Sequence, residues 1–583
     1  MAMIHGGEVV AKMLKEEGVE KVFGIIDGTY FGFYSNLRKY GIEIITPRHE
    51  TSAVHMAGTY ARMTGKLGVC MASNGPGVAN ALPGVAVENA EGNRVLLITS
   101  KRRLQISQPD RGGTYQWFDQ VGVIQKMSKW SEAVTSPDRI SELIRMALRE
   151  SYKGRPGVVH IDIPENIMNT KIEPPALWKK NQYRRQHDIY PDPDLVKEAA
   201  EILVQARMPM IHAGSGIIHA LAFNELEKLA EVLSAPVTTS WAARSVLRES
   251  SEYSFPMPYV KINNKIRNDA DVVLVLGSRI GETDWWGKAP YWKNAAEQKM
   301  IQVDIDDSIL GMNKPADLAI LADLKKFIPA LIKELENQKS KMNLDVRKSN
   351  LRFYQDLKRS LRKDYDKKLQ DKEEPMITAH VPHICREVFP DDAICVMDGG
   401  NTAVWANFYQ EFPVPNTVVS TFKFGMLGAG ISQALGAAVA FPERQVYCII
   451  GDGAMGFHPQ EIETAIRNNL KPIYIVISDR QWGMVKLTQE IALKPIQTMV
   501  FKKLPETEVI NTDLGEIEFH TLAESMGAFG ARVKKPEDFR TALKAAIANN
   551  KCAVIHVDVD PVKHKWVPGL MDFKDMHNEP KGK

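Results

Sequence analysis

The chain has 583 residues, of which 44% are hydrophobic and 25% are charged, and its formal net charge is +3. These proportions are typical of folded soluble proteins and exclude a wholly disordered or fibrous chain. The small net charge also argues against a dedicated binder of nucleic acid or membrane surfaces. At roughly 150 residues per domain, the length predicts three or four domains.

The cysteines and the N-terminus indicate a cytoplasmic protein. The five cysteines are scattered without a CxxC pair, and we interpret them as reduced, buried thiols. The N-terminus carries Glu8 and Lys12 and has no apolar stretch, so we expect no signal peptide. The longest uncharged run, 425–441, is short for a membrane span and is predicted to be a buried helix.

Short β-branched runs alternate with helix-like segments along most of the chain. Most of these runs are continuously apolar, as in strands buried on both faces of parallel sheets. The fold class is therefore predicted as α/β, with three doubly wound, mainly parallel-sheet domains. The predicted strands are 69–73, 95–100, 158–163, 210–213, 272–277, 301–305, 393–397, 446–450, 473–478 and 553–559.

Two polar stretches separate these domains. Residues 172–194 contain four prolines and little apolar periodicity, which predicts a linker after which Pro193 opens a helix. Residues 339–374 are basic, with apolar residues at helical spacing, which predicts a surface helix between two domains. The predicted domains are 1–172, 195–337 and 375–560, followed by a tail, 561–583, that we interpret as a flap over a site or a frayed end.

A glycine-rich turn follows one strand of the third domain. The segment Gly451-Asp452-Gly453-Ala454 lies between that strand and a helix-like stretch. Such a turn presents backbone N–H groups to a phosphate. Asp452 cannot face a phosphate directly because the charges repel, but it can hold a divalent cation that does. Asp479 follows the next strand, so both aspartates are predicted to meet at one metal on the same sheet edge.

Four further segments lie after predicted strands or before predicted helices. The segment 399–402 also follows a strand of the third domain, and 423–428 precedes the apolar helix. In the first domain, Glu50 opens a helix and 74–77, with the sequence NGPG, follows a strand. Glu50 by itself would only complement the helix dipole.

In combination, these segments are more specific than any one of them. Their order and spacing resemble the thiamine-diphosphate enzymes of the acetolactate synthase and pyruvate oxidase family, over nearly the whole chain from about 3 to 560. The resemblance implies a pyrimidine-binding, a central and a diphosphate-binding domain, in that order. It also implies two cofactors, thiamine diphosphate and Mg²⁺.

The resemblance assigns roles to individual residues. Glu50 would bond the aminopyrimidine ring and favour the tautomer that takes the proton from the thiazolium carbon. Gly425 would bond the exocyclic amine through its carbonyl, and Leu427 would bend the cofactor. The residues implied to lie beside the diphosphate are Gly399, Gly400, Asn401, Thr402, Gly451, Gly453 and Ala454. Asp452, Asp479 and the carbonyl of Gln481 would hold the metal, and Trp482, Gly483 and Met484 would begin the helix that follows.

On the substrate side, Gly28 falls on a loop that the family places near the reactive carbon. Tyr115 and Gln116 fall on a Phe-Gln pair that lines the substrate. Two positions depart from the family. Ser478-Asp479 replaces a pair of asparagines, and Thr488 stands where acetolactate synthases have a tryptophan that reads the second 2-oxo acid.

The implied function is cleavage or formation of a C–C bond next to a carbonyl, as in acetolactate-synthase-like decarboxylation of a 2-oxo acid with carboligation. Other motif spellings are similar to sulfoacetaldehyde acetyltransferase, and the pattern at Tyr115, Asp119 and Gln120 is similar to oxalyl-CoA decarboxylase and 2-hydroxyacyl-CoA lyases. A non-catalytic, nucleotide-binding regulatory paralogue and a Rossmann-type dehydrogenase are further alternatives.

The predicted partners are a small 2-oxo acid or acyl-type substrate and a second copy of the chain, with no nucleic acid and no membrane. The family builds its site from two chains, which implies a homodimer or a dimer of dimers. The central domain would carry FAD, ADP or nothing, with Asp304 placed for ribose hydroxyls. The cations at 101–103 would meet an anionic substrate or only solvent.

Overall fold

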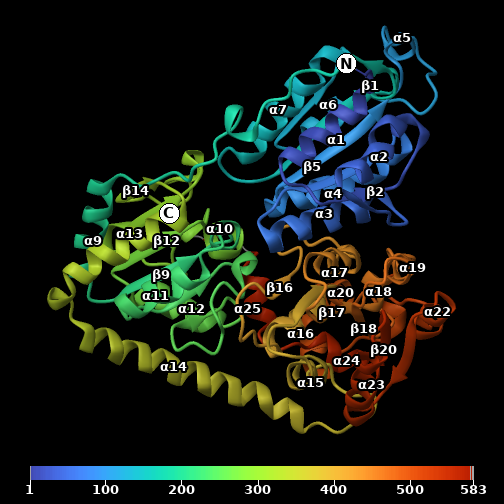
Figure 1. The fold of residues 1–583 in the computed structure, drawn as a ribbon. Helices are drawn as coiled ribbons and strands as arrows, with labels where there is room; N and C mark the ends of the chain where they lie inside the picture. Colours follow the sequence, from blue (N-terminus) through green and yellow to red (C-terminus); the bar gives the residue numbers. More distant parts are fainter. Residues whose placement is uncertain (1, 578–579, 581–583) are drawn as a thin grey trace.

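The computed structural model describes residues 2–577 and 580, and it contains three α/β domains (Figure 1). Each domain is built on a six-stranded sheet. Every neighbouring pair of strands in these sheets is parallel. This confirms the predicted fold class. None of the described helices is both long and apolar enough to cross a bilayer.

The first domain has the strand order β3-β2-β4-β5-β7-β6. Its strands are β2 (Lys21–Gly24), β3 (Glu43–Ile45), β4 (Gly68–Ala72), β5 (Val95–Lys101), β6 (Trp130–Ala133) and β7 (Val158–Pro164). Its helices are α1 (Gly6–Glu16), α2 (Phe31–Leu37), α3 (Glu50–Thr64), α4 (Pro76–Glu91), α5 (Leu104–Ser107), α6 (Gln120–Gln125), α7 (Ile140–Tyr152) and α8 (Glu165–Met168). A separate antiparallel pair, β1 (Ile4–His5) with β8 (Lys171–Ile172), ties the N-terminus to the start of the linker.

The central domain has the strand order β11-β10-β9-β12-β13-β14. Its strands are β9 (Pro209–Ala213), β10 (Val237–Thr239), β11 (Ser254–Phe255), β12 (Val272–Leu276), β13 (Lys299–Asp304) and β14 (Leu318–Leu321). Its helices are α9 (Pro193–Gln205), α10 (Gly216–Ala220), α11 (Phe223–Leu233), α12 (Val260–Asp269) and α13 (Leu324–Asn337). Helix α9 begins at Pro193, where the sequence predicts it, because Asp192 caps the helix and proline suits its first turn.

The third domain has the strand order β16-β15-β17-β18-β20-β19. Its strands are β15 (Ile394–Asp398), β16 (Val418–Val419), β17 (Val446–Gly451), β18 (Ile473–Ser478), β19 (Phe529–Val533) and β20 (Ala553–Asp558). Its helices are α15 (His380–Val388), α16 (Asn401–Tyr409), α17 (Ala429–Ala440), α18 (Asp452–Met455), α19 (Glu461–Arg467), α20 (Gly483–Leu493), α21 (Pro495–Phe501), α22 (Phe519–Ser525) and α23 (Pro536–Asn549).

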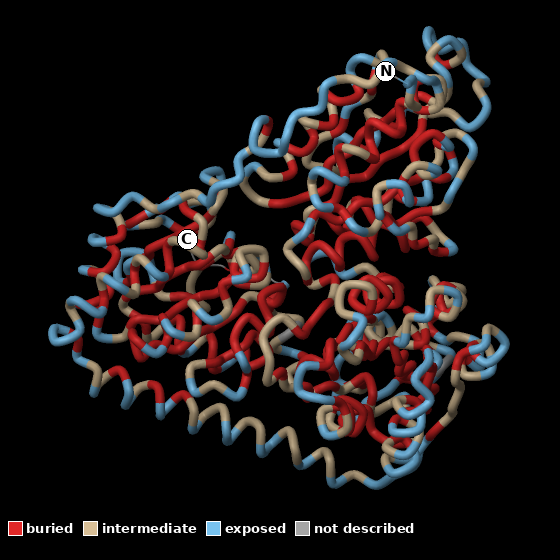
Figure 2. The backbone as a smooth tube through the Cα atoms, in the orientation of Figure 1, coloured by how far each residue is buried: buried red, intermediate tan, exposed pale blue. Residues whose placement is uncertain are grey.

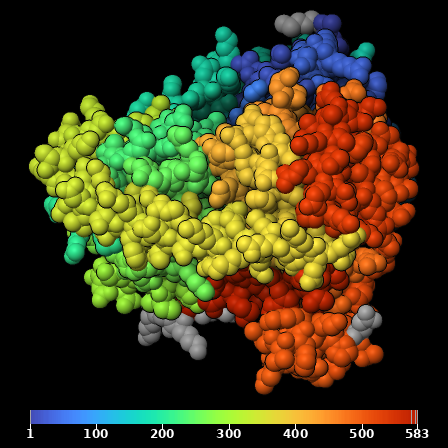
Figure 3. Space-filling view, turned by 90° about the horizontal axis from the view of Figure 1, so that it is seen from below, coloured from blue at the N-terminus to red at the C-terminus, as the bar shows by residue number. Residues whose placement is uncertain are grey.

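A long surface helix, α14 (Leu344–Asp366), joins the central and third domains. Seen from below, it runs as a yellow band across both (Figure 3). The tail is more regular than its sequence pattern indicates, since it forms α24 (Pro561–Lys565) and α25 (Leu570–Asp575). Lys565 Nζ lies 2.6 and 2.7 Å from the two carboxylate oxygens of Glu490, and this buried ion pair fixes the tail to α20.

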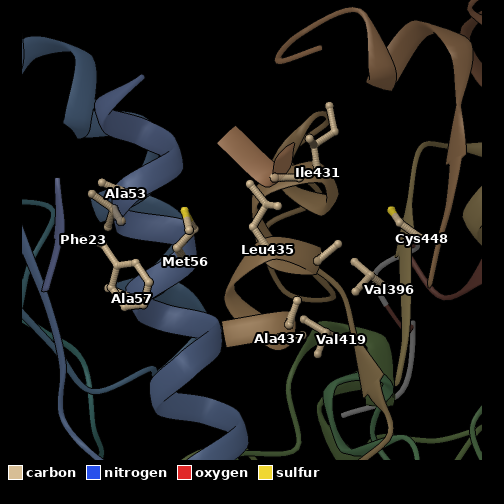
Figure 4. Close-up of a cluster of buried hydrophobic side chains, with 14 of the residues drawn as sticks. Phe23, Ala53, Met56, Ala57, Val396, Val419, Ile431, Leu435, Ala437 and Cys448 are labelled. Atoms are coloured by element: carbon tan, nitrogen blue, oxygen red, sulfur yellow. The ribbon is translucent and has the colours of Figure 1, made fainter. Parts of the chain in front are cut away.

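The sheets form the buried part of each domain, while α14 is largely exposed (Figure 2). The apolar run predicted as a buried helix is α17, and it packs against α3 of the first domain. Met56 of α3 points toward Leu435 of α17, whereas Ala53 and Ala57 lie on the other side of α3, beside Phe23 (Figure 4). One apolar core therefore continues from the first domain into the third and joins them.

Candidate active site

The carboxyl ends of three strands meet at one edge of the third sheet. Asp398 pairs with Ile450, and Gly451 pairs with Ile477, so β15, β17 and β18 end side by side. The chain continues from β15 to β16 on one side, whereas β17 lies on the other side. The crevice between β15 and β17 is thus a topological switch point, where open α/β sheets bind ligands.

The two aspartates predicted to hold a metal lie at this edge and are both buried. The Asp452 carboxylate accepts hydrogen bonds from the backbone N–H groups of Gly453 at 2.7 Å and Arg480 at 2.8 Å. The Asp479 carboxylate accepts one from the side chain of Gln481 at 3.0 Å. Burial raises the pKa of each aspartate to about 6, and the charge of Asp479 adds to the rise for Asp452. Two adjacent buried carboxylates of this kind would be stabilised by a cation.

Asn401 provides the clearest sign that this edge suits a polar ligand. It is 3% exposed, and both atoms of its side-chain amide lack a hydrogen-bond partner within the described part of the chain. A Cβ on Gly483 would lie 2.9 Å from Asn401 Nδ2 and 3.0 Å from Asp479 Oδ2, so both side chains border the same point. Buried amides are normally satisfied, and a polar ligand at this edge would satisfy this one.

Aromatic and sulfur-containing side chains close over the same edge. A Cβ on Gly453 would lie 2.7 Å from the ring of Trp482, so only glycine fits there. A Cβ on Gly400 would lie 3.1 Å from Cβ of Met484. Trp482 and Met484 are thereby placed on the predicted phosphate turns.

A cavity of about 660 Å³ opens beside this edge and lies between the three domains. The third domain lines it with Gly399, Gly400, Gly425, Leu427 and Met484, all of which the sequence assigns to cofactor binding. Gly425 has φ = 69°, a left-handed conformation that favours glycine, and its N–H bonds the carbonyl of Thr421 at 2.7 Å.

The other walls of the cavity carry charge. Arg155 comes from the first domain, and Arg279 and Asp304 come from the ends of central strands. The neighbouring Arg279 adds to the effect of burial, which lowers the pKa of Arg155 to about 10. Burial raises the pKa of Asp304 to about 6.

Glu50 lies at a second site, in the first domain. It begins α3, is 9% exposed, and its Oε2 accepts a hydrogen bond from Asn80 Nδ2 at 3.1 Å. A Cβ on Gly77 would lie 3.3 Å from Glu50 Oε1. The NGPG turn therefore packs directly on the carboxylate.

A hydrogen-bond network holds the other predicted first-domain residues around this turn. Gln116 accepts a bond from Asn74 Nδ2 at 2.9 Å through its carbonyl. The side chain of Gln120 accepts from the N–H of Gly75 at 2.9 Å and donates to Asp162 at 2.8 Å. Burial raises the pKa of Asp162 to about 7.

The loop that carries Gly28 joins the same network through Ser100. The hydroxyl of Ser100 lies 2.6 Å from that of Thr29 and accepts a bond from the N–H of Asn74 at 2.9 Å. Gly28, Gln116 and the NGPG turn are thus held on one surface of the first domain.

The two groups of residues do not face one cavity within this chain. Glu50, Gly28, Tyr115 and Gln116 are absent from the described lining of the cavity. Asn401, Asp452 and Asp479 are absent from it too, since they lie at the sheet edge beside it. Tyr115 is 74% exposed, so it points to solvent.

The comparisons with known proteins agree with this arrangement. Residues 4–123 match the family described as "Thiamine pyrophosphate enzyme, N-terminal TPP binding domain", 196–331 match its central domain, and 398–557 match its C-terminal TPP binding domain. The chain belongs to the thiamine-diphosphate enzymes of the acetolactate synthase and pyruvate oxidase family.

Full-length relatives of this thiamine-diphosphate enzyme are similar over almost their whole chains. This chain is 28% identical to a probable acetolactate synthase large subunit of Methanococcus aeolicus, over 96% of this chain and 92% of that protein. It is 26% identical to the acetolactate synthase isozyme 3 large subunit of Escherichia coli K12, over 97% and 96% respectively.

Several residues of the enzyme's site escaped the sequence prediction. Asn80 was not noticed because it lies 30 residues from Glu50, which it contacts only after folding. Gln120 was named only as part of a family-like pattern, and its bond to Gly75, 45 residues away, could not be predicted. Asp398 was noticed only as the end of a strand, yet its carboxylate bonds the N–H groups of Gly399 and Gly430 at 2.6 and 2.7 Å and thus fixes the start of α17.

His564, in the tail, also reaches the edge of the third sheet. Its Nε2 lies 3.9 Å from Asp479 Oδ2, and its Nδ1 lies 2.6 Å from Thr378 Oγ1. Burial lowers its pKa to about 4, so it is neutral. The aperiodic pattern of the tail gave no signal for this position.

The three cations at 101–103 are paired within the chain. Arg102 and Arg103 lie 3.5 and 3.0 Å from the carboxylate of Glu165, and Lys101 lies 4.0 Å from Asp162. Their charges are thus largely balanced within the first domain, which weakens their assignment to an anionic substrate.

Proposed function

We propose that this enzyme decarboxylates a 2-oxo acid and joins the resulting acyl unit to a second carbonyl compound, as its relatives named acetolactate synthases indicate. The observation that carries the proposal is the edge of the third sheet. There a buried, unpartnered asparagine and two buried aspartates converge at a switch point. The chemistry of that edge fits a diphosphate held through a cation.

The residues present fit thiamine diphosphate with Mg²⁺. Asp452, Asp479 and the carbonyl of Gln481 would hold the metal, and Asn401 and the N–H groups of the 451–454 turn would bind the diphosphate. When bound, thiamine diphosphate supplies a nucleophilic carbon that also serves as an electron sink. Gly425 and Leu427, on the cavity wall, would orient it.

Glu50 would share a proton with the aminopyrimidine ring. Its carboxylate is well placed for this role, because Asn80 fixes one oxygen and the NGPG turn excludes water from the other side. Gln116 and Gly28 would line the substrate side of the same surface.

Completing the site requires a second copy of the chain. The Glu50 surface and the cavity do not meet within one chain, and both regions expose apolar side chains. Phe31 of the first domain is 50% exposed, and Phe424 and Val485 of the third are 51% and 53% exposed. A lobe near residue 500 also projects from the molecule (Figure 3), and Ile496 within α21 is 81% exposed. Apolar surface of this extent is typical of an interface, here of a homodimer or a dimer of dimers.

The central wall of the cavity suits an adenine nucleotide or FAD. Arg155 and Arg279 would meet its diphosphate, and Asp304 its ribose hydroxyls. Calorimetric titration with ADP and with FAD would test this part. If neither ADP nor FAD binds, the proposal of a nucleotide in the central domain is wrong, and the proposal of thiamine diphosphate binding is unaffected.

Purified enzyme with thiamine diphosphate, Mg²⁺ and pyruvate tests the main proposal. We expect release of CO₂ and formation of acetolactate, identified by mass spectrometry. The same assay with sulfoacetaldehyde or a 2-hydroxyacyl-CoA tests the alternatives, which the relatives do not favour. A protein that binds the cofactor but consumes none of these substrates would favour the regulatory alternative.

The five cysteines are buried and unpaired, which supports a reducing, cytoplasmic compartment.

A further inference from the structure

Lys423 lies where the three domains meet. Its backbone N–H donates to Glu91 Oε1 at 2.7 Å, and its Nζ donates to the Glu91 carbonyl at 3.3 Å and to Ser215 Oγ at 3.0 Å. Glu91 ends α4 in the first domain, and Ser215 precedes α10 in the central domain. One residue of the third domain therefore contacts both others.

The loop that contains Lys423 is also held by two internal bonds, from the Gly425 N–H to the Thr421 carbonyl and from Thr421 Oγ1 to the Met426 carbonyl, and by the stacking of Phe422 on Trp241. Residues 420–428 connect β16 to α17 and contain Gly425 and Leu427, which line the cavity. Ser420 bonds the carbonyl of Met397 at 2.7 Å, which fixes the start of the loop. Beyond that point Phe424 is 51% exposed, and no described atom lies within 4 Å of a Cβ placed on Gly425. The middle of the loop is thus open on the side that would face the cofactor.

The contact between Lys423 and Glu91 is sensitive to the loss of either partner. Glu91 is 2% exposed, and its carboxylate faces the loop. Burial and the neighbouring Arg155 and Arg279 lower the pKa of Lys423, whereas Glu91 opposes that shift. Removing the lysine side chain would leave the carbonyl of Glu91 and the hydroxyl of Ser215 without the donor that joins them to the loop, while the bond from the Lys423 backbone N–H to the Glu91 carboxylate would remain.

We propose that Lys423 is a positioning residue for the cofactor. By joining the loop to α4 and α10, it holds the carbonyl of Gly425 and the side chain of Leu427 at the cavity wall. The inference rests on the proposed function, because it assigns a role toward thiamine diphosphate. It adds that the affinity of the third domain for the cofactor depends on the first and central domains of the same chain.

Cofactor binding tests this inference without an activity assay. Full-length apoprotein is titrated with thiamine diphosphate at saturating Mg²⁺, and quenching of tryptophan fluorescence reports binding, since Trp482 packs on Gly453. For Lys423→Met we expect about tenfold weaker binding, the effect of losing one or two charged hydrogen bonds. Lys423→Arg should bind within about threefold of wild type, because it keeps the charge and the donors.

Two controls separate positioning from general damage. Lys228→Met removes an exposed lysine that pairs only with Glu231 on the surface of α11, and it should bind the cofactor like wild type. Ser215→Ala removes one hydroxyl and should weaken binding by about two- to threefold, even if Lys423→Met proves too unstable to titrate. If Lys423→Met and Ser215→Ala both bind thiamine diphosphate as tightly as wild type, the inference is wrong but the proposed function still stands. A wild-type protein that does not bind the cofactor would overturn the proposed function with it.

Discussion

The edge of the third sheet and the Glu50 surface of the first domain differ in how far their polar groups are satisfied. At the third-sheet edge, Asn401 has no partner among the described residues, and two carboxylates crowd each other. On the first-domain surface, Glu50, Gln120 and Ser100 all have partners within the chain. A polar ligand would satisfy the first region, whereas the polar groups of the second are already satisfied within the chain.

This difference indicates that the two regions have different roles toward the cofactor. At the third-sheet edge, two buried carboxylates repel each other, and a bound cation would relieve that repulsion. This edge is therefore suited to hold a cofactor. The first-domain surface is rigid without any ligand, and its exposed Tyr115 and Phe31 face outward. Such a surface is suited to act on a cofactor that another chain holds.

Glu50→Gln should have the largest effect on turnover. The amide keeps an oxygen for Asn80 but cannot share a proton with the cofactor, so we expect activity to fall by about a hundredfold or more. Cofactor affinity and melting temperature should stay near wild type. Steady-state kinetics beside a fluorescence titration measures both, and turnover within threefold of wild type would contradict the assignment.

Asp452→Ala should mainly affect cofactor binding. Loss of a metal ligand should weaken thiamine diphosphate affinity by about ten- to a hundredfold. Removal of Mg²⁺ by EDTA should weaken the binding of thiamine diphosphate to the wild-type protein, whereas its binding to the variant should change little. If the variant binds as tightly as wild type and still responds to EDTA, the metal lies elsewhere.

Gln120→Met should affect turnover more modestly. It removes the acceptor for Gly75 and the donor to Asp162, which loosens the turn beside Glu50. We expect about a tenfold fall in kcat with unchanged cofactor affinity, the cost of one or two buried hydrogen bonds. A parallel loss of cofactor affinity would show that the network supports the whole fold rather than this surface.

Asp479→Asn should have the smallest effect and serves as the matched control for Asp452→Ala. The asparagine keeps an oxygen at the metal and removes one of two crowded charges. Cofactor affinity should therefore stay within about threefold of wild type. A loss above tenfold would mean that the second negative charge is required.

The sequence predicted the elements that carry strong local signals. All ten predicted strands are present, because most of them are continuous apolar runs, and the strand ends located the switch point. Short edge strands such as β16, with two residues, carry too little pattern to be recognised. The two helices of the tail were missed as well, because their stability comes from partners far along the chain, such as Glu490 for Lys565.

Individual residues of the candidate site could be predicted from the sequence, but the hydrogen bonds that hold them in place could not. Glycine-rich turns and acidic residues after strands are local features, so Asp452 and Asp479 could be named from them, whereas the role of Glu50 came from the resemblance to the family. The side chains that hold them, Asn80 and Gln120, depend on long-range packing. In the sequence, Lys423 was only the first residue of the segment before the apolar helix, and its contacts with the other two domains appear only in the structure.

Mixing two impaired variants, at a cofactor concentration too low for Asp452→Ala to bind it, tests the central claim that each site is shared between two chains. Glu50→Gln and Asp452→Ala are purified separately, unfolded or dissociated together, and reassembled in equal amounts with cofactor and Mg²⁺. In a shared site, random pairing gives half mixed dimers, and one of the two sites in each has both intact halves, so about a quarter of wild-type activity should return. If each chain formed its own site, every site would keep one defect, and the mixture would stay as inactive as its components.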